Sequence, residues 1–228
     1  ITTTIKKLGQ SKADTRCVTV PYMNELYKQA GLANAEAAFE AWIGKKIQEK
    51  RGLQTLAPVV NYNLPIVFHI VHNGATPGLG DNVSQARIQS QLAQINKDFA
   101  NLSNSPHGVA ASSGLQFYLA QKDPSGLPLA EPGIRRINAP IELPTLGNPP
   151  YSISSVNTTI KSNTIWDPTR YLNIWVVALA DDILGFATFP TQSGLDGLSG
   201  GETLTNAGVV VDGQTVGSLV NQGVSCSI

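Results

Sequence analysis

Apolar and polar residues follow two kinds of spacing along the chain, one typical of strands and one typical of helices, and together they predict an α/β fold. Residues 64–72 and 115–120 are short, β-rich apolar runs, the second with apolar residues at alternate positions. Between them, residues 83–102 repeat apolar side chains at helical spacing, with Ser84 as a candidate N-cap. Strand, helix and strand at this spacing predict two parallel strands joined by a right-handed crossover helix.

The stretch 171–190 is the one around which we expect the other elements to be arranged. Residues 172–179 are almost continuously apolar, the composition of a strand buried on both faces. Asp181 and Asp182 interrupt the run, and a second short strand begins at Gly185 and stops at Pro190. A buried strand that folds back into a short edge strand predicts a sheet with one border left open, where an extended peptide could lie.

Two helices are predicted before the first strand. Residues 23–30 form a short helix, and Asn34 is a candidate N-cap for a longer one that runs to about Lys50. The longer helix carries one apolar stripe, made of Phe39, Trp42, Ile43 and Ile47. Elsewhere, residues 152–165 have weak helical character, and 207–211 are a last apolar run.

Composition and charge narrow the class of protein. The chain has 228 residues and a net charge of zero, which argues against a nucleic-acid binder that relies on phosphate attraction. No apolar run reaches the roughly 20 residues that span a bilayer. Residues 1–51 carry nine Lys and Arg against five Asp and Glu, and the remainder carries seven against eleven. A basic leader docked across an acidic cleft and ordinary surface variation explain this asymmetry equally well. The first residues do not have the pattern of a signal peptide, so we expect a cytosolic chain or one numbered from a processed start.

Few side chains are candidates for chemistry. His69 and His72 stand three apart on a predicted strand and point to opposite faces, so they cannot chelate one ion together. We expect these two histidines and His107 to be core or surface residues. Asp181 and Asp182 are a candidate carboxylate pair for catalysis or calcium, although such a pair is more often a solvated turn. No H-E-x-x-H, C-x-x-C, G-x-S-x-G or P-loop motif occurs.

Only two cysteines occur, Cys17 and Cys226, too few for a disulfide-built scaffold. Arg16 beside Cys17 favours the thiolate, which would make Cys17 a nucleophile or a metal ligand. A spare or bridged thiol is the alternative. A bridge between the two cysteines and two unrelated thiols are equally compatible with the sequence.

Several of these segments, taken in order, resemble the pappalysin-type metzincin metallopeptidases, in particular their secreted bacterial members. R-C-V-T at residues 16–19 is similar to the R-C-G-T-like motif of the family's pro-segment, with Val18 in place of glycine. L-P-I-V-F-H-I-V-H-N, L-Q-F-Y-L-A-Q-K-D-P-S-G, G-I-R-R-I, Y-L-N-I-W-V and L-G-F-A-T-F-P follow in the family's order. The resemblance covers about residues 15–211.

The resemblance implies three parts: a pro-segment-like leader with Cys17 at 1–51, a linker or activation region at 52–63, and the N-terminal sub-domain of a catalytic domain at 64–228. The implied fold is the metzincin upper sub-domain, a twisted mixed sheet that is mostly parallel with one antiparallel edge strand and a crossover helix, preceded by a helical pro-segment. The backbone of the edge strand would bind an extended peptide, through Gly185, Phe186, Ala187 and Thr188.

The resemblance also implies a latent, secreted zinc metalloendopeptidase, in which zinc activates the water that hydrolyses a peptide bond. Cys17 would cap that zinc until the leader is cut at Arg51–Gly52, and calcium is a candidate second ion. The expected partners are a peptide or protein substrate and the chain's own leader, with no nucleic acid and no membrane span.

The family's H-E-x-x-H-x-x-G-x-x-H motif does not occur in this sequence. We therefore assign no catalytic residue and expect the chain to be inactive as written. Two alternatives stay open. One is a metal-free, protease-derived module that binds peptide or serves a structural role, and the weaker one is a protease inhibitor made from pro-segment-like parts.

Overall fold

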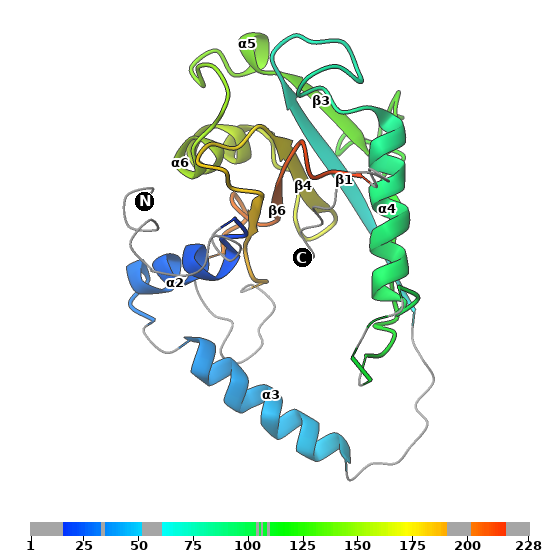
Figure 1. Cartoon of the computed structure of the whole chain (residues 1–228), viewed down its shortest axis with the longest axis vertical. Coiled ribbons are helices and arrows are strands. Elements are labelled where there is room, and N and C mark those ends of the chain that lie inside the picture. The colour runs from blue at the N-terminus through cyan, green and yellow to red at the C-terminus, as the bar shows by residue number, and fades with distance from the viewer. Residues whose placement is uncertain are drawn as a thin grey trace.

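The long strand β1 (Tyr62–His72) is central to the fold, because it has neighbours along both of its edges (Figure 1). The structure is a computed structural model and describes residues 16–32, 35–51, 61–103, 105, 107, 108, 110–190 and 202–217. The other elements are α2 (Thr19–Gln29), α3 (Ala35–Arg51), α4 (Gln85–Phe99), β2 (Leu115–Leu119), β3 (Ile134–Asn138), α5 (Ala139–Glu142), α6 (Ile153–Ser155), the π-helix η1 (Val156–Lys161), α7 (Ser162–Thr164), β4 (Leu172–Val177), β5 (Gly185–Ala187) and β6 (Val209–Asp212).

The described residues build one six-stranded sheet in the order β2-β1-β4-β6-β5. The first half of β1 pairs with β2, and its second half pairs with β3 along the same edge. Every strand pair of this sheet is parallel except β5 with β6. The predicted mixed sheet, mostly parallel with one antiparallel edge strand, is therefore confirmed, and so is the crossover helix α4.

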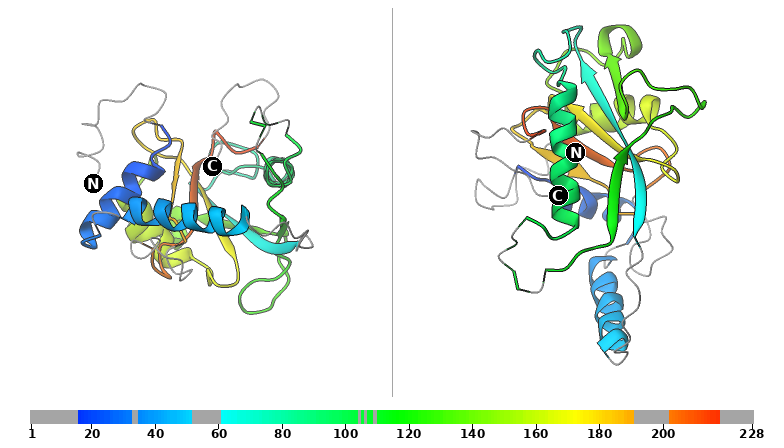
Figure 2. Two further views of the ribbon diagram at one scale, coloured as in Figure 1. Left: turned by 90° about the horizontal axis from the view of Figure 1, so that it is seen from below. Right: turned by 90° about the vertical axis from the view of Figure 1, so that its right-hand side faces the viewer.

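Different helices cover the two faces of the sheet (Figures 1 and 2). Helix α4 packs on one face, where Ile88 joins a buried cluster with Phe68 and Val176. On the other face, α2 and the α6–α7 segment pack over Trp175 and Val210. The predicted N-cap of α4 is confirmed, since the Ser84 side chain accepts a hydrogen bond from the Arg87 N–H.

Two predicted boundaries are wrong. Strand β1 begins at Tyr62, which pairs with Leu115, so the linker predicted for 52–63 ends earlier than expected. Helix α2 begins at Thr19 and not at residue 23, and its first turns include Tyr22, which is buried. Within residues 171–190, β5 is the predicted edge strand, and β6 lies between β4 and β5 and hydrogen-bonds to both.

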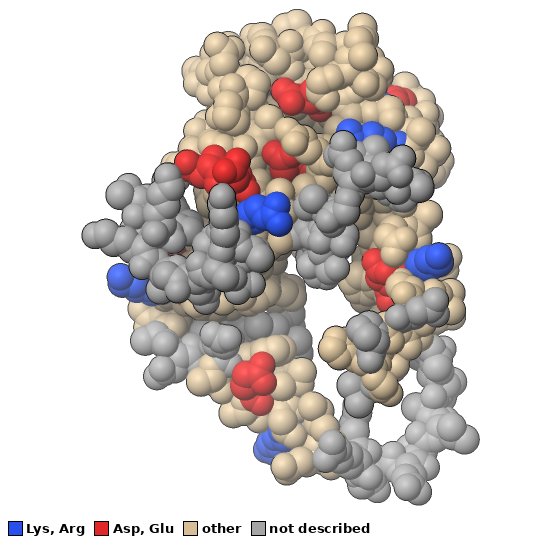
Figure 3. All heavy atoms as spheres, viewed as in Figure 1, with Lys and Arg blue, Asp and Glu red and all other residues tan. Residues whose placement is uncertain are grey.

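Helix α3 lies away from the sheet in Figure 1. Two members of its predicted stripe, Phe39 and Trp42, stack with their ring centroids 5.8 Å apart, and Ile47 is 47% exposed. The proposed N-cap Asn34 lies outside the described residues. None of the described helices is both long and apolar enough to cross a membrane. Figure 3 shows side chains of both charges scattered over the face it presents.

Candidate peptide-binding edge

Strand β5 carries three of the four residues predicted to bind a peptide, and it lies at the end of the sheet. Its inner edge pairs with β6, with Gly185 opposite Val211 and Ala187 opposite Val209. Gly185 makes this approach possible, because a Cβ atom there would lie 2.6 Å from the Val210 carbonyl oxygen. A larger residue would push the strand off β6, so the glycine at the start of β5 has a packing reason.

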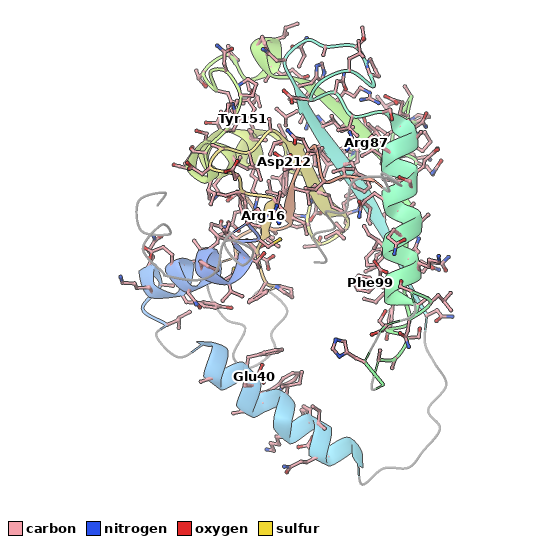
Figure 4. All side chains as sticks on the ribbon, in the orientation of Figure 1. Arg16, Glu40, Arg87, Phe99, Tyr151 and Asp212 are labelled. Atoms are coloured by element: carbon pink, nitrogen blue, oxygen red, sulfur yellow. The ribbon has the colours of Figure 1, made fainter. Side chains whose placement is uncertain are left out.

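Residues 16–18, in the part of the chain predicted to be a leader, occupy the outer edge of β5. The Leu184 N–H donates to the Arg16 carbonyl at 2.7 Å, and the Val18 N–H donates to the Gly185 carbonyl at 3.1 Å. Cys17 and Gly185 form a parallel bridge between these two bonds. The prediction of an open border is therefore wrong for this state of the chain, because residues 16–18 pair with the edge. Figure 4 shows Arg16 next to this end of the sheet.

Helix α2 anchors the leader beyond this pairing. The Ala187 N–H donates to the Thr19 hydroxyl oxygen at 3.2 Å. The Tyr22 ring meets the Phe186 ring edge-on, with centroids 4.9 Å apart. Burial raises the pKa of the Tyr22 phenol to about 12, so it is neutral at physiological pH. Four leader side chains are buried in the same core cluster as Phe186: Val18, Tyr22, Met23 and Tyr27.

The C-terminal end of β5 is held by the segment that leads into β6. The Thr188 N–H donates to the Gly208 carbonyl at 3.2 Å, and the Gly208 N–H donates to the Thr188 hydroxyl at 3.0 Å. The Thr188 hydroxyl donates in turn to the Glu202 carboxylate at 3.1 Å. Residues 202–208 therefore fix the position of the last predicted peptide-binding residue.

Sequence reasoning missed Lys161, which lies under this strand. Its side chain is fully buried, its ammonium donates to the Asn206 carbonyl at 2.9 Å, and the nitrogen lies 5.1 Å from the ring centroids of both Trp175 and Phe186. Burial lowers the pKa of Lys161 to about 7, against the opposing attraction of Glu202. The signal in the sequence was a single lysine in an otherwise uncharged stretch, which helical periodicity does not single out.

The histidines are where the sequence placed them. His69 is fully buried, bonds Asn173 through Nε2 at 2.8 Å and stacks on Trp175 with centroids 5.3 Å apart. Burial lowers the pKa of His69 to about 3, so this imidazole is neutral. His72 is buried near the end of β1, and His107 is exposed. The prediction of core and surface histidines is confirmed.

No metal centre forms among the residues that the structure describes, where no three His, Cys, Asp or Glu side chains gather. Asp181 and Asp182 are exposed and both have left-handed backbones, with φ of 61° and 56°, as in a tight turn. Cys17 is disulfide-bonded. A disulfide sulfur has no thiolate to offer a metal. Arg51 ends α3, while Gly52 and Cys226 lie outside the described residues.

Solved structures of mirolysin and promirolysin are similar to this chain, three of them as follows. "Mirolysin in complex with compound 9" shares 30% identity with a TM-score of 0.53, over 69% of this chain and 55% of that one. Tannerella forsythia mature mirolysin in complex with a cleaved peptide shares 31% identity with a TM-score of 0.53, over 70% and 56%. A mutant of Tannerella forsythia promirolysin shares 26% identity with a TM-score of 0.60, over 88% and 60%.

The chain is similar to mirolysin. It spans 55 to 60% of the length of these three solved chains. No protein-family model matches it, and neither does any curated protein.

Proposed function

We propose that this chain is the leader and upper sub-domain of a latent pappalysin-type metallopeptidase related to mirolysin. Strand β5 is the strand that pairs with an extended peptide substrate, through the backbone of Gly185, Phe186, Ala187 and Thr188. Leader residues 16–19 hold that strand until the leader is removed. The observation that carries the proposal is the backbone pairing of the leader with the outer edge of β5.

Structural similarity supports the assignment of the leader. The promirolysin structure covers 88% of this chain and mature mirolysin 70%. The difference, 18% of 228 residues, is about 40 residues, close to the length of the leader. Mature mirolysin was solved with a cleaved peptide, which supports a peptide as the ligand of the related edge here.

The proposal includes zinc only for an enzyme that also has the zinc-binding residues. The described residues do not offer the three protein ligands that a catalytic zinc normally takes, so we derive no hydrolytic step from them. Cys17 would cap such a zinc only with its disulfide reduced, since the thiolate is the ligand. Cleavage at Arg51–Gly52, secretion and a calcium requirement stand as parts of the proposal that follow from the family resemblance.

The test is to open the edge of β5 in the full chain and measure peptide binding. Val18→Pro removes the N–H that donates to Gly185. Val18→Ala shortens the same side chain but keeps that N–H. The probe is a fluorescein-labelled, extended octapeptide of Thr, Val and Arg, followed by fluorescence anisotropy.

We expect the Val18→Pro variant to bind the octapeptide at least tenfold more tightly than the parent chain, with Val18→Ala in between. Protection of the Leu184 and Ala187 amides by the peptide would place it on β5. Equal binding by all three proteins, or protection elsewhere, would refute β5 as the peptide-binding strand. Binding at β5 by a complete protein that has no zinc and no hydrolysis would favour the metal-free peptide-binding module.

A further inference from the structure

Lys161 is the last residue of the π-helix η1, and its charged group is buried in the core against rings from β4 and β5. Lysine is almost never fully buried unless its charge is paired. Here the ammonium faces the rings of Trp175 on β4 and Phe186 on β5, at 5.1 Å from each centroid. Short π-helices often mark functional positions, because they move a side chain out of the α-helical register. The proposed function gives this lysine no role.

We infer that Lys161 is a positioning residue for peptide binding at β5, acting through residues 202–208, which lead into β6. This inference rests on the proposed function, because that function puts the peptide on β5.

The positioning runs through two sets of contacts. Lys161 donates to the carbonyl of Asn206 at 2.9 Å, which holds residues 202–208 against the sheet. That segment grips the C-terminal end of β5, since Thr188 bonds both Gly208 and Glu202. The cation also lies against the Phe186 ring, in the middle of β5. Moving the Lys161 ammonium into water would therefore release β5 at two places, its C-terminal end at Thr188 and its middle at Phe186.

We call the contact between Lys161 and residues 202–208 the latch. Its opening responds to pH in one direction. Burial lowers the pKa of Lys161 to about 7, whereas a lysine in water titrates near 10.4. The closed segment therefore binds fewer protons than an opened one, in which the ammonium is hydrated. Between pH 7 and 10 each rise of one unit disfavours opening by about tenfold, and below pH 7 the equilibrium is flat.

Few other titratable groups face this lysine among the described residues. Glu202 is the charged group that acts on it, and its attraction favours the ammonium. Tyr22 lies across the Phe186 ring and His69 across the Trp175 ring. With pKa values of about 12 and about 3, both stay neutral between pH 5 and 9. The pH response in that range therefore belongs to Lys161.

Amide hydrogen exchange of the full chain tests the latch. Fragments that contain residues 185–188 are followed by mass spectrometry from about pH 6 to pH 9, with correction for the intrinsic exchange rate. We expect their opening to fall about fifty-fold between pH 7 and pH 9 and to be constant below pH 7. Lys161→Met fills a similar volume but has neither the charge nor the donor to Asn206, so its opening should be independent of pH. Lys97→Met, at an exposed position on α4, should behave as the parent chain does.

A flat profile in the parent chain would overturn the inference, and it needs no variant that could fail to fold. A pH-dependent Lys161→Met variant would overturn it as well. In the Val18→Pro background, octapeptide affinity should tighten above pH 7 with Lys161 and stay constant with Lys161→Met. If no peptide binds, the proposed function fails, while the exchange profile still decides whether Lys161 controls the strand.

Discussion

At the scale of single residues, two buried bases lie against Trp175, and burial disfavours the charged form of both. His69 stacks on one side of this indole, and the Lys161 nitrogen lies over the same ring system. Burial is the first cause of the lowered pKa in both side chains. Each base must therefore lose its proton before folding or carry a charge into the core, and this makes stability depend on pH.

His69 predicts a loss of stability in acid. The unfolded imidazole takes up its proton below about pH 6.5, whereas the folded one does so only near pH 3. The contribution is therefore complete above pH 6.5 and is lost as the pH falls toward 3, by roughly 3 kcal/mol at pH 4.5. His69→Gln can still donate to Asn173, so urea unfolding of this variant should show a shallower loss. His107→Gln, at an exposed position, should keep the parent's acid dependence, and a His69→Gln profile identical to the parent's would contradict the assignment.

The close approach of Gly185 to β6 predicts a steric effect at this edge of the sheet. Alanine there would place its Cβ 2.6 Å from the Val210 carbonyl oxygen, so β5 must move away from β6. We expect Gly185→Ala to lower the free energy of unfolding by about 1 to 3 kcal/mol in thermal or urea denaturation. Gly44→Ala is the matched control, because nothing lies within 4 Å of a Cβ there and alanine favours the helix. Equal effects of the two substitutions would show that the close approach at Gly185 is not costly.

At the scale of elements, helix α2 belongs to the core as much as the strands do. Its N-cap residue and three of its helical side chains are buried among residues of the sheet and of the α6–α7 segment: Val18, Tyr22, Met23 and Tyr27. Full burial of an apolar side chain stabilises by roughly 1.5 to 3 kcal/mol. The backbone hydrogen bonds to β5 orient the helix, but they contribute less free energy to this contact than the buried side chains do. Cutting the chain between leader and body therefore leaves the contact intact.

The retention of a cut leader is directly measurable. A specific protease site placed between Arg51 and Gly52 allows cleavage of the folded chain, and size-exclusion chromatography with reductant then separates bound from free leader. We expect the leader to co-elute with the body, because its apolar anchors remain buried. Tyr22→Ala should release it, whereas Lys28→Ala, on the exposed side of α2, should not. Immediate loss of the parent's leader would contradict this prediction.

The sequence predicted the elements better than their neighbours. Alternation, helical spacing and Ser84 were enough for β1, α4 and β2, because these signals are local. The partner of β5 was not predicted, since pairing between distant strands leaves no local pattern in either one. For the same reason the leader was predicted as a leader, but not as the strand partner of Gly185. Lys161 was missed because its burial depends on Trp175 and Phe186, which come from two other strands.

At the scale of the whole molecule, the proposed division at residues 51 and 52 does not coincide with the limits of the core. One buried cluster contains leader residues together with Trp175 of β4 and Val210 of β6. The second cluster, under α4, consists of residues from the body alone. A leaderless body would keep the second cluster and expose much of the first. The proposed removal of the leader would therefore change the folded unit as well as open one strand.

The distance along the chain between the leader and its strand sets an order of events during synthesis. Thr19 and Ala187, which hydrogen-bond in the folded protein, are separated by 168 residues. At roughly 5 to 20 residues per second, the ribosome makes β5 about 10 to 30 seconds after the leader. Throughout that interval Tyr22 and Met23 have no partner strand to cover them. Residues 19–23 are thus made well before the strand that covers them, and they reach their final contacts late.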